Sequence, residues 1–265
     1  MMPRNSITGQ SMTEFLIIVP IVVVLIMGAV QLVFVYQAKT TLNYATFEAA
    51  RAASLENASL SAMQAGLARG MAPYFTRPGS EALGSTEDLA NVDETADVTQ
   101  LAADVARGHQ KAKDEIAAGY VHFERINPTP EAFDDAWAYD IGGGEREIPN
   151  DHLLFRASTP GGSSGLSIQD NNLLKIRVTW CMKLIVPFVN RFFVASARTL
   201  GTYDEDAAQW HTDRGSNIDG AWGNYEAWCL SSHERTPGDY RWPVVAHAVI
   251  RMQSAPRSCP GCFEP

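Results

Sequence analysis

The sequence predicts an α+β protein with a transmembrane helix at its N-terminus, and three observations lead to that prediction. An uncharged apolar run occupies residues 15–37, which at ~1.5 Å per residue extends over roughly 34 Å and is long enough to cross a bilayer core. Helical periodicity follows it as far as residue 116, and segments with strand character then extend from residue 120 to residue 254. Helices first and strands later favour an α+β ectodomain with a mostly antiparallel sheet.

Composition narrows the class of protein. The 265 residues, 46% of them hydrophobic, are enough to bury one substantial core beside a membrane segment. The formal net charge of -9 and the pI near 5.1 give no electrostatic reason to expect nucleic acid as a partner, because phosphates require clustered Lys and Arg. An acidic surface instead suits a soluble ectodomain.

The apolar run "FLIIVPIVVVLIMGAVQLVFVYQ", residues 15–37, is typical of a membrane span. A cleavable secretory signal has a shorter apolar region followed by small residues at the cleavage site, whereas Tyr36 occupies one of those positions here. Pro20 lies within the run, where bilayer helices tolerate proline. Arg4 is the only basic residue before the span, so the N-terminus is expected in the cytoplasm and the remaining chain outside it.

A glutamate stands at the start of this span, in "GQSMTEF", residues 9–15. A charged carboxylate costs about 2.5 to 3.5 kcal/mol at the centre of a membrane helix and less near the interface. One interpretation is that Glu14 marks the interfacial end of an ordinary signal anchor. The other starts from the spacing, because Glu14 is the fifth residue after Gly9 and apolar residues follow at once.

That spacing resembles the class III signal of type IV pilins. The resemblance implies that prepilin peptidase cuts between Gly9 and Gln10. The cut would create a new α-amino group about one helical turn from the Glu14 carboxylate, close enough to compensate its charge within a subunit or between packed subunits.

The N-terminal region is also similar to the TadE-like family. The features that carry the resemblance are Glu14, Phe15, Pro20, Gly28 and "AARAAS" at residues 49–54, and together they cover roughly the first 55 residues. The major pilin of tight-adherence systems is a very short chain dominated by its hydrophobic helix, whereas this chain continues far beyond its helix. The resemblance therefore implies a minor pilin or pseudopilin of a tight-adherence type IV pilus.

The same resemblance implies an organisation, a location and partners. Residues 1–9 would be a prepilin leader, 10–58 a transmembrane and assembly helix, and 59–265 a pilin-like extracytoplasmic α+β domain. The protein would lie in the bacterial inner membrane with a periplasmic C-terminal domain, or be incorporated into the pilus. Its partners would be prepilin peptidase, other pilins, the inner-membrane assembly platform and membrane lipid. The alternative is a signal-anchored periplasmic binding or thiol-active protein unrelated to pili.

Beyond the span, helical spacing is expected to continue over residues 38–57 and again over 98–116. The small residues of the first stretch allow close approach to a neighbouring helix or to the protein's own globular part. Gly66, Gly70, Pro73 and Pro78 are expected to end the first helical region. His109 falls on the apolar stripe of the second and is interpreted as a structural side chain. The first stripe consists of Leu42, Ala45, Ala49, Ala52 and Leu55.

Strands are expected at residues 120–126, 152–158, 172–186 and 242–254, with the clearest alternation at 175–180. Two stretches, "IGGGEREIPN" at 141–150 and "STPGGSSG" at 158–165, have turn or loop composition. Residues 184–195 are apolar, but Pro187, Asn190 and Arg191 interrupt them and they are too few for a second span. They are interpreted as buried core or as a subunit contact.

Four cysteines, Cys181, Cys229, Cys259 and Cys262, are candidates for disulfides. Their even number suits an oxidising compartment, and three pairings remain open. A bridge from Cys181 to Cys229 would tie the Trp-rich region 204–240 to a strand. The "CPGC" at 259–262 has the form of a redox motif, but the chain ends three residues later, so no helix follows to lower the thiolate pKa.

No pattern in the sequence predicts catalysis. The histidines lack metal-ligand spacing, the triple glycine at 142–144 lacks the Lys-Ser/Thr ending of a phosphate loop, and no Gly-x-Ser-x-Gly elbow is present. Neighbouring acids such as Asp134 and Asp135, or Asp204 and Asp206, are interpreted as solvated. We therefore expect no catalytic residue, no metal and no cofactor.

Overall fold

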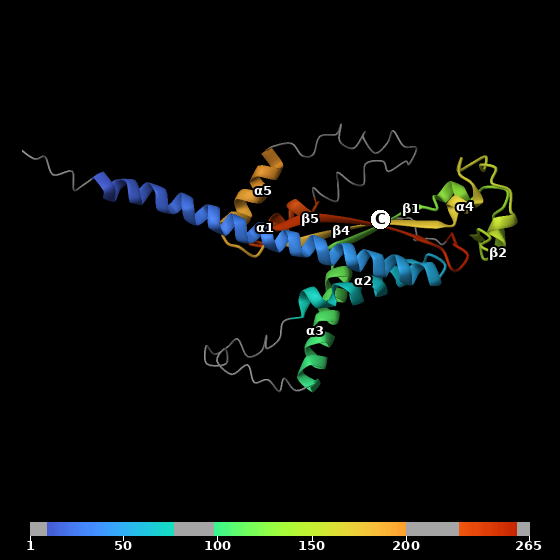
Figure 1. The fold of residues 1–265 in the computed structure, drawn as a ribbon, viewed down its shortest axis with the longest axis horizontal. Coiled ribbons are helices and arrows are strands. Elements are labelled where there is room, and N and C mark those ends of the chain that lie inside the picture. Colours follow the sequence, from blue (N-terminus) through green and yellow to red (C-terminus); the bar gives the residue numbers. More distant parts are fainter. Residues whose placement is uncertain (1–9, 77–97, 200–227, 259–265) are drawn as a thin grey trace, which may run out of the picture.

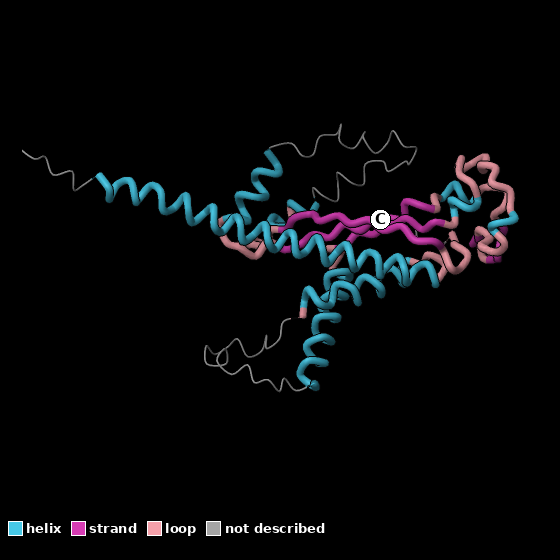
Figure 2. Tube along the Cα trace, in the orientation of Figure 1, coloured by secondary structure: helices cyan, strands magenta, loops and turns pink. Residues whose placement is uncertain are grey.

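A long helix lies along a three-stranded antiparallel sheet, and its N-terminal half projects beyond the rest of the molecule (Figure 1). The computed structural model describes residues 10–76, 98–199 and 228–258. Figure 2 shows the strands side by side against the second half of the long helix, with shorter helices beside it. The prediction of an N-terminal apolar helix, further helices and then an antiparallel sheet is confirmed.

The long helix α1 spans Gln10–Leu55, and its surroundings change along its length. From Gln31 onward one face is buried at spacings of three, four and seven residues, because this half packs on the sheet and on the next helix. The predicted stripe is confirmed over most of its length but not at Leu55, which is 62% exposed where the helix ends. The buried positions include Gln31, Ala38, Leu42, Ala45, Ala49 and Ala53.

The next helix, α2 at Leu60–Phe75, corrects the expectation that two glycines and Pro73 end the helical region, because all three lie inside it; Pro78 lies outside the described residues. Gly66 and Gly70 lie inside α2 and face α1. A Cβ added at Gly70 would lie 2.5 Å from the Cα of Ala45, and one at Gly66 would lie 2.7 Å from the Cα of Ala49. The two glycines are therefore required by the close crossing of the helices, a constraint that propensity alone does not reveal.

The third helix, α3 at Val98–Ala117, packs on α2. Its buried positions are Asp104, Gly108 and Ala112, whereas Val105 is 47% exposed. Of the predicted apolar stripe, Ala112 and the half-buried Ile116 face the core, whereas Val105 does not, because Gly108 is where α3 comes close to the end of α2. His109 is half-buried at the edge of this contact.

The sheet consists of β1 at Val121–Asn127, β4 at Leu173–Lys183 and β5 at Arg241–Arg251, in the order β1-β4-β5. Three of the four predicted strands are confirmed by these elements. Trp180 on the central strand is paired with Val121 on one side and Val244 on the other. Its ring also packs edge-on against Tyr74, at 5.0 Å between centroids, so this face of the sheet forms the main core with α1 and α2.

The fourth predicted strand, residues 152–158, is wrong. This stretch contains a short 3-10 helix, η4 at Leu153–Phe155, in which Leu154 and Phe155 are 89% and 85% exposed. Its three apolar residues are consecutive rather than alternating, so they cannot all face one side of a sheet.

The loop predicted at residues 141–150 is in part a hairpin. Strands β2 at Tyr139–Gly142 and β3 at Glu145–Glu147 pair across Gly143 and Gly144. These two glycines have φ values of 71° and 83°, which side chains rarely adopt. Glycines interpreted as loop residues therefore form the turn between two strands.

A second, smaller core lies at the end of the sheet that is far from the projecting part of α1. Asp135, interpreted from sequence as solvated, is only 2% exposed there. Its Oδ1 accepts a hydrogen bond from the backbone N–H of Ser163 at 2.8 Å, so the carboxylate organises the Gly/Ser loop. The elements of this region are η3 at Pro130–Phe133, η4 and α4 at Ile168–Asn171.

The close crossing of α1 and α2 can be tested with Gly70→Ala. The added methyl would meet the backbone of Ala45, which cannot move away independently, so we expect a loss of about 1 to 3 kcal/mol despite the better helix propensity of alanine. The measurement is the denaturant midpoint of the protein in detergent, followed by tryptophan fluorescence.

The matched control for that measurement is Gly28→Ala, a helical glycine with no atom within 4 Å of an added Cβ. It should leave the midpoint unchanged or raise it slightly. Equal effects of the two substitutions would contradict the steric role assigned to Gly70.

Candidate functional site at the projecting helix

The N-terminal half of α1 presents an apolar surface that the described part of the chain leaves uncovered. We call residues 14–30 the projecting segment. Phe15 and Leu25 are 65% and 67% exposed, and the apolar stretch has a mean hydropathy of 2.9. Among the described residues it belongs to the one helix that is long and apolar enough to cross a membrane. Because water tolerates such a surface poorly, the segment fits a single-pass membrane anchor.

Gln31 marks the point where the ectodomain begins to cover α1. Its side chain is fully buried, and its Oε1 accepts a hydrogen bond from the backbone N–H of Val186 at 3.0 Å. This junction lies inside the predicted span of residues 15–37. Sequence reasoning missed Gln31, although a signal was present, because it is the only amide between Glu14 and Gln37.

The residues predicted for processing and assembly lie at the other end of the helix. Gln10 is the first residue of α1 and Glu14 follows it by one turn, on an exposed position beside Phe15. Gly9 lies outside the described residues. The geometry is that of an exposed carboxylate at the start of an apolar helix, and the roles of these four residues stay a prediction.

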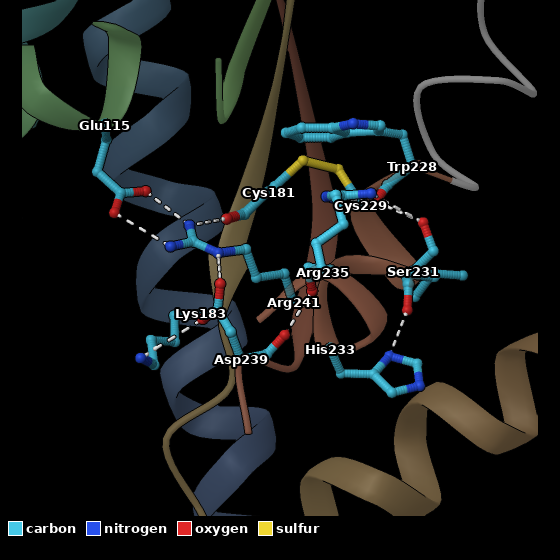
Figure 3. A network of polar contacts seen from close by, with 12 residues as sticks. Glu115, Cys181, Lys183, Trp228, Cys229, Ser231, His233, Arg235, Asp239 and Arg241 are labelled. Atoms are coloured by element: carbon cyan, nitrogen blue, oxygen red, sulfur yellow. Dashed lines mark hydrogen bonds and ion pairs between the residues drawn. A yellow bond between two sulfur atoms is a disulfide. The ribbon is translucent and has the colours of Figure 1, made fainter. Parts of the chain in front are cut away.

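A buried charge cluster lies at the end of the sheet nearest the projecting segment (Figure 3). Arg241 on β5 donates from Nε to Asp239 at 2.8 Å, from Nη1 to Glu115 on α3 at 2.8 Å and from Nη1 to the carbonyl oxygen of Cys181 at 2.9 Å. Its guanidinium also stacks on the ring of Tyr120, 3.3 Å from the centroid. One side chain therefore joins α3, β4 and β5.

The electrostatics of this cluster favour the charged form of Arg241. Burial by itself lowers the pKa of Arg241, but hydrogen bonds to Glu115 and Asp239 outweigh it and raise the pKa above its ordinary value. Asp239 also forms an ion pair with Lys183, with 3.4 Å between the charged atoms. Glu115 accepts a hydrogen bond from the indole N–H of Trp180 at 3.3 Å. Both carboxylates thus join Arg241 to neighbouring elements of the fold.

A disulfide between Cys181 and Cys229 lies beside the charge cluster, with 5.3 Å between the Cα atoms (Figure 3). It links β4 to the segment that precedes α8 at Ser232–Arg235. Cys259 and Cys262 lie outside the described residues. Within the Trp-rich region, the described residues begin at Trp228. The guanidinium of Arg235 stacks on the ring of Trp228, 4.0 Å from its centroid.

The end of the sheet also contains a cavity of about 200 Å³. Lys111, Lys183 and Glu115 contribute charged groups to its wall, and Glu115 accepts a hydrogen bond from Arg241. Within the three described stretches, no group of three or more His, Cys, Asp or Glu is arranged to hold a metal ion. The cavity is lined by Tyr74, Phe75, Lys111, Glu115, Trp180, Lys183 and Ile185.

Comparison with known families gives one match, to the family described as TadE-like protein, at residues 9–51. Over these residues the N-terminal helix is similar to that family. The match begins at Gly9, includes the whole projecting segment, and continues through Ala45 and Ala49 at the contact with α2. The TadE-like family is a structural family associated with pili. No curated protein and no solved structure matches the chain.

The charge cluster around Arg241 can be tested with Arg241→Met. The substitution leaves Glu115 and Asp239 buried without their main cation, so we expect a loss of about 3 to 5 kcal/mol in the free energy of unfolding. The measurement is chemical denaturation in detergent at neutral pH.

The control is Arg156→Met, which removes an exposed pair with Asp151 at 2.6 Å. Exposed pairs contribute little, so the control should unfold close to the parent protein. A similar small effect of Arg241→Met would show that the cluster is not what holds α3, β4 and β5 together.

Proposed function

We propose that the protein is a minor pilin or pseudopilin of a tight-adherence type IV pilus. It is processed by prepilin peptidase after Gly9, inserted in the bacterial inner membrane by the projecting segment, and presents residues 59–265 in the periplasm. The observation that carries the proposal is the projecting TadE-like helix, with Glu14 one turn from Gln10. The pilus platform and other pilins are its proposed partners.

The position of Glu14 supports processing. Its carboxylate costs about 2.5 to 3.5 kcal/mol if a bundle of apolar helices draws it to the centre of a membrane. A new α-amino group on Gln10, about one turn away, offers an opposite charge, and two unit charges at ~4 Å attract by about 4 kcal/mol at an effective dielectric constant of ~20. Packing the helix against other helices therefore becomes favourable after the cut.

The shape of the projecting segment supports assembly. Gly28 has no atom within 4 Å of an added Cβ, in contrast to the glycines of α2. A glycine with open space on an apolar helix is where another helix can approach closely. At the opposite end of the molecule, Leu154 and Phe155 expose large apolar side chains, which we assign to contacts of the ectodomain with other pilus components.

The alternative function is a signal-anchored periplasmic binding or thiol-active protein. It depends on Cys259 and Cys262 acting as a redox pair, and alkylation of the native protein followed by mass spectrometry would find reactive thiols there. The TadE-like match and the position of Glu14 favour the pilus instead, because a thiol enzyme requires neither.

The processing step can be tested by N-terminal mass spectrometry of membrane-purified protein coexpressed with a prepilin peptidase. We expect a mature chain that begins at Gln10, and a full-length chain for Gly9→Ala. Gly28→Ala should be cut normally, which controls for the general effect of replacing a glycine. An intact N-terminus, or one near residue 39, would exclude the pilin interpretation.

The role of the carboxylate can be tested with Glu14→Gln. This variant should still be cut after Gly9 but should co-purify with the other pilins of the system much less than the parent, because the charge that pairs with the new amine is gone. Glu48→Gln, on the half of α1 that packs on the ectodomain, is the control and should co-purify normally. Normal co-purification of Glu14→Gln would remove the assembly role of Glu14.

A further inference from the structure

The helix that follows the central strand has two faces, of which one is apolar and exposed. Helix α5 spans Val189–Thr199. Val189 and Val194 are buried against the core at 3% and 2% exposure. Two large aromatic side chains, one on this helix and one in the turn before it, are exposed, and we call them the α5 face. The α5 face consists of Phe188 and Phe192, which are 80% and 68% exposed.

The α5 face lies at the junction between the ectodomain and the projecting segment. The hydrogen bond from Val186 to Gln31 fixes the turn before α5 to α1, and α1 and α5 are in contact. Figure 1 shows that α5 lies across the direction of α1 rather than along it. A membrane crossed by α1 therefore has its surface roughly parallel to α5.

The length of the projecting segment sets the depth of this junction. From Phe15 to Val30 there are 16 residues, which at ~1.5 Å per residue cover about 24 Å. The hydrocarbon core of a bilayer is about 30 Å thick. If Glu14 lies at the far interface of the bilayer, Gln31 lies at or just inside the boundary of the hydrocarbon core on the other side. Helix α5 then lies at the same depth, because it contacts α1 near Gln31.

The charges around α5 agree with that depth. Residues 184–199 contain Arg191 and Arg198 and no Asp or Glu, in a chain of net charge -9. Arg191 is exposed, with its guanidinium 5.9 Å from the centre of the Tyr240 ring. Aromatic and aliphatic side chains together with a long cationic one are typical of helices that lie in the headgroup region.

Phe188 adds a backbone argument. Its φ is 64°, in the left-handed region that bulky residues avoid. A glycine would satisfy this turn with less strain, so folding of the isolated chain does not account for a phenylalanine whose ring is 80% exposed. A contact outside the chain does account for it, and strained positions of this kind cluster at functional sites.

We propose that the α5 face inserts into the membrane surface on the ectodomain side, at the boundary between lipid headgroups and acyl chains. The ectodomain is thereby held against the bilayer at a second point beside α1. This inference rests on the membrane anchor of the proposed function and is independent of processing and of the pilus.

Photocrosslinking in a bilayer tests the inference directly. The full chain is reconstituted in nanodiscs of phosphatidylcholine and phosphatidylglycerol with p-benzoylphenylalanine at position 188, 192 or 155. We expect lipid adducts at 188 and 192 and none above background at 155, because Phe155 is equally exposed but lies at the far end of the molecule. Position 24, in the projecting segment, is the positive control.

Two outcomes would overturn the inference. One is the absence of lipid adducts at 188 and 192 while position 24 forms them. The other is crosslinking of these two positions only to a second copy of the chain, which would make the α5 face a subunit contact. Failure of cleavage after Gly9 in the separate processing experiment would leave either result unaffected.

Phe188→Gly separates a lipid contact from a role in folding. It should leave the denaturant midpoint in detergent unchanged or higher, because it relieves the left-handed backbone. In nanodiscs the amides of α5 should exchange with solvent faster than in the parent protein, whereas those of β4 should not change. A lower midpoint in detergent would indicate that Phe188 serves the fold, and unchanged exchange of α5 in nanodiscs would contradict its insertion.

Discussion

The structure depends on one continuous helix, α1, whose first half is exposed and apolar and whose second half is buried in the core. The first half of α1 exposes eleven large apolar side chains between Phe15 and Val30, and covering most of this surface is worth on the order of 10 kcal/mol or more. That is comparable with the ~5–15 kcal/mol that keep a whole domain folded. The second half of the same helix lies in the core of the ectodomain, with Leu42 and Ala45 fully buried. Position and tilt of the membrane segment therefore cannot change without moving the ectodomain core.

Two sets of contacts keep the ectodomain fixed to that helix. The glycines of α2 allow its backbone to approach α1 at Ala45 and Ala49. At the other end of this shared region, the side chain of Gln31 accepts a hydrogen bond from the backbone N–H of Val186. Close to it, Arg241 joins α3, β4 and β5 by hydrogen bonds, and the Cys181–Cys229 disulfide links β4 to the segment before α8. These hydrogen bonds and ion pairs thus hold the end of the sheet rigidly beside the point where α1 leaves the globular part.

The parts of the fold that were predictable are those specified by local pattern. The span follows from hydropathy, the packed face of α1 from spacing, and β4 from the alternation around Ile176 and Trp180, because each pattern is contained in a few consecutive residues. The α2 glycines were misinterpreted since the reason for them is a partner helix about 20 residues earlier in the chain, which propensity does not report. Residues 152–158 were misinterpreted since a short apolar run does not distinguish a strand from a turn of helix.

The residues of the candidate site divide in the same way, into those that a local pattern reveals and those that depend on distant parts of the chain. Glu14 is visible from sequence because a charge stands out beside an apolar run, and its significance depends only on a neighbour five residues away. Arg241 and Glu115 are 126 residues apart, so no local signal connects them. Phe188 illustrates the intermediate case. Its sequence context is typical of ordinary apolar core, and only the backbone conformation and the exposed ring show that the fold does not use it. Phe188 is therefore where the protein leaves an apolar side chain uncovered in a strained backbone conformation, and lipid is the occupant that we propose for it.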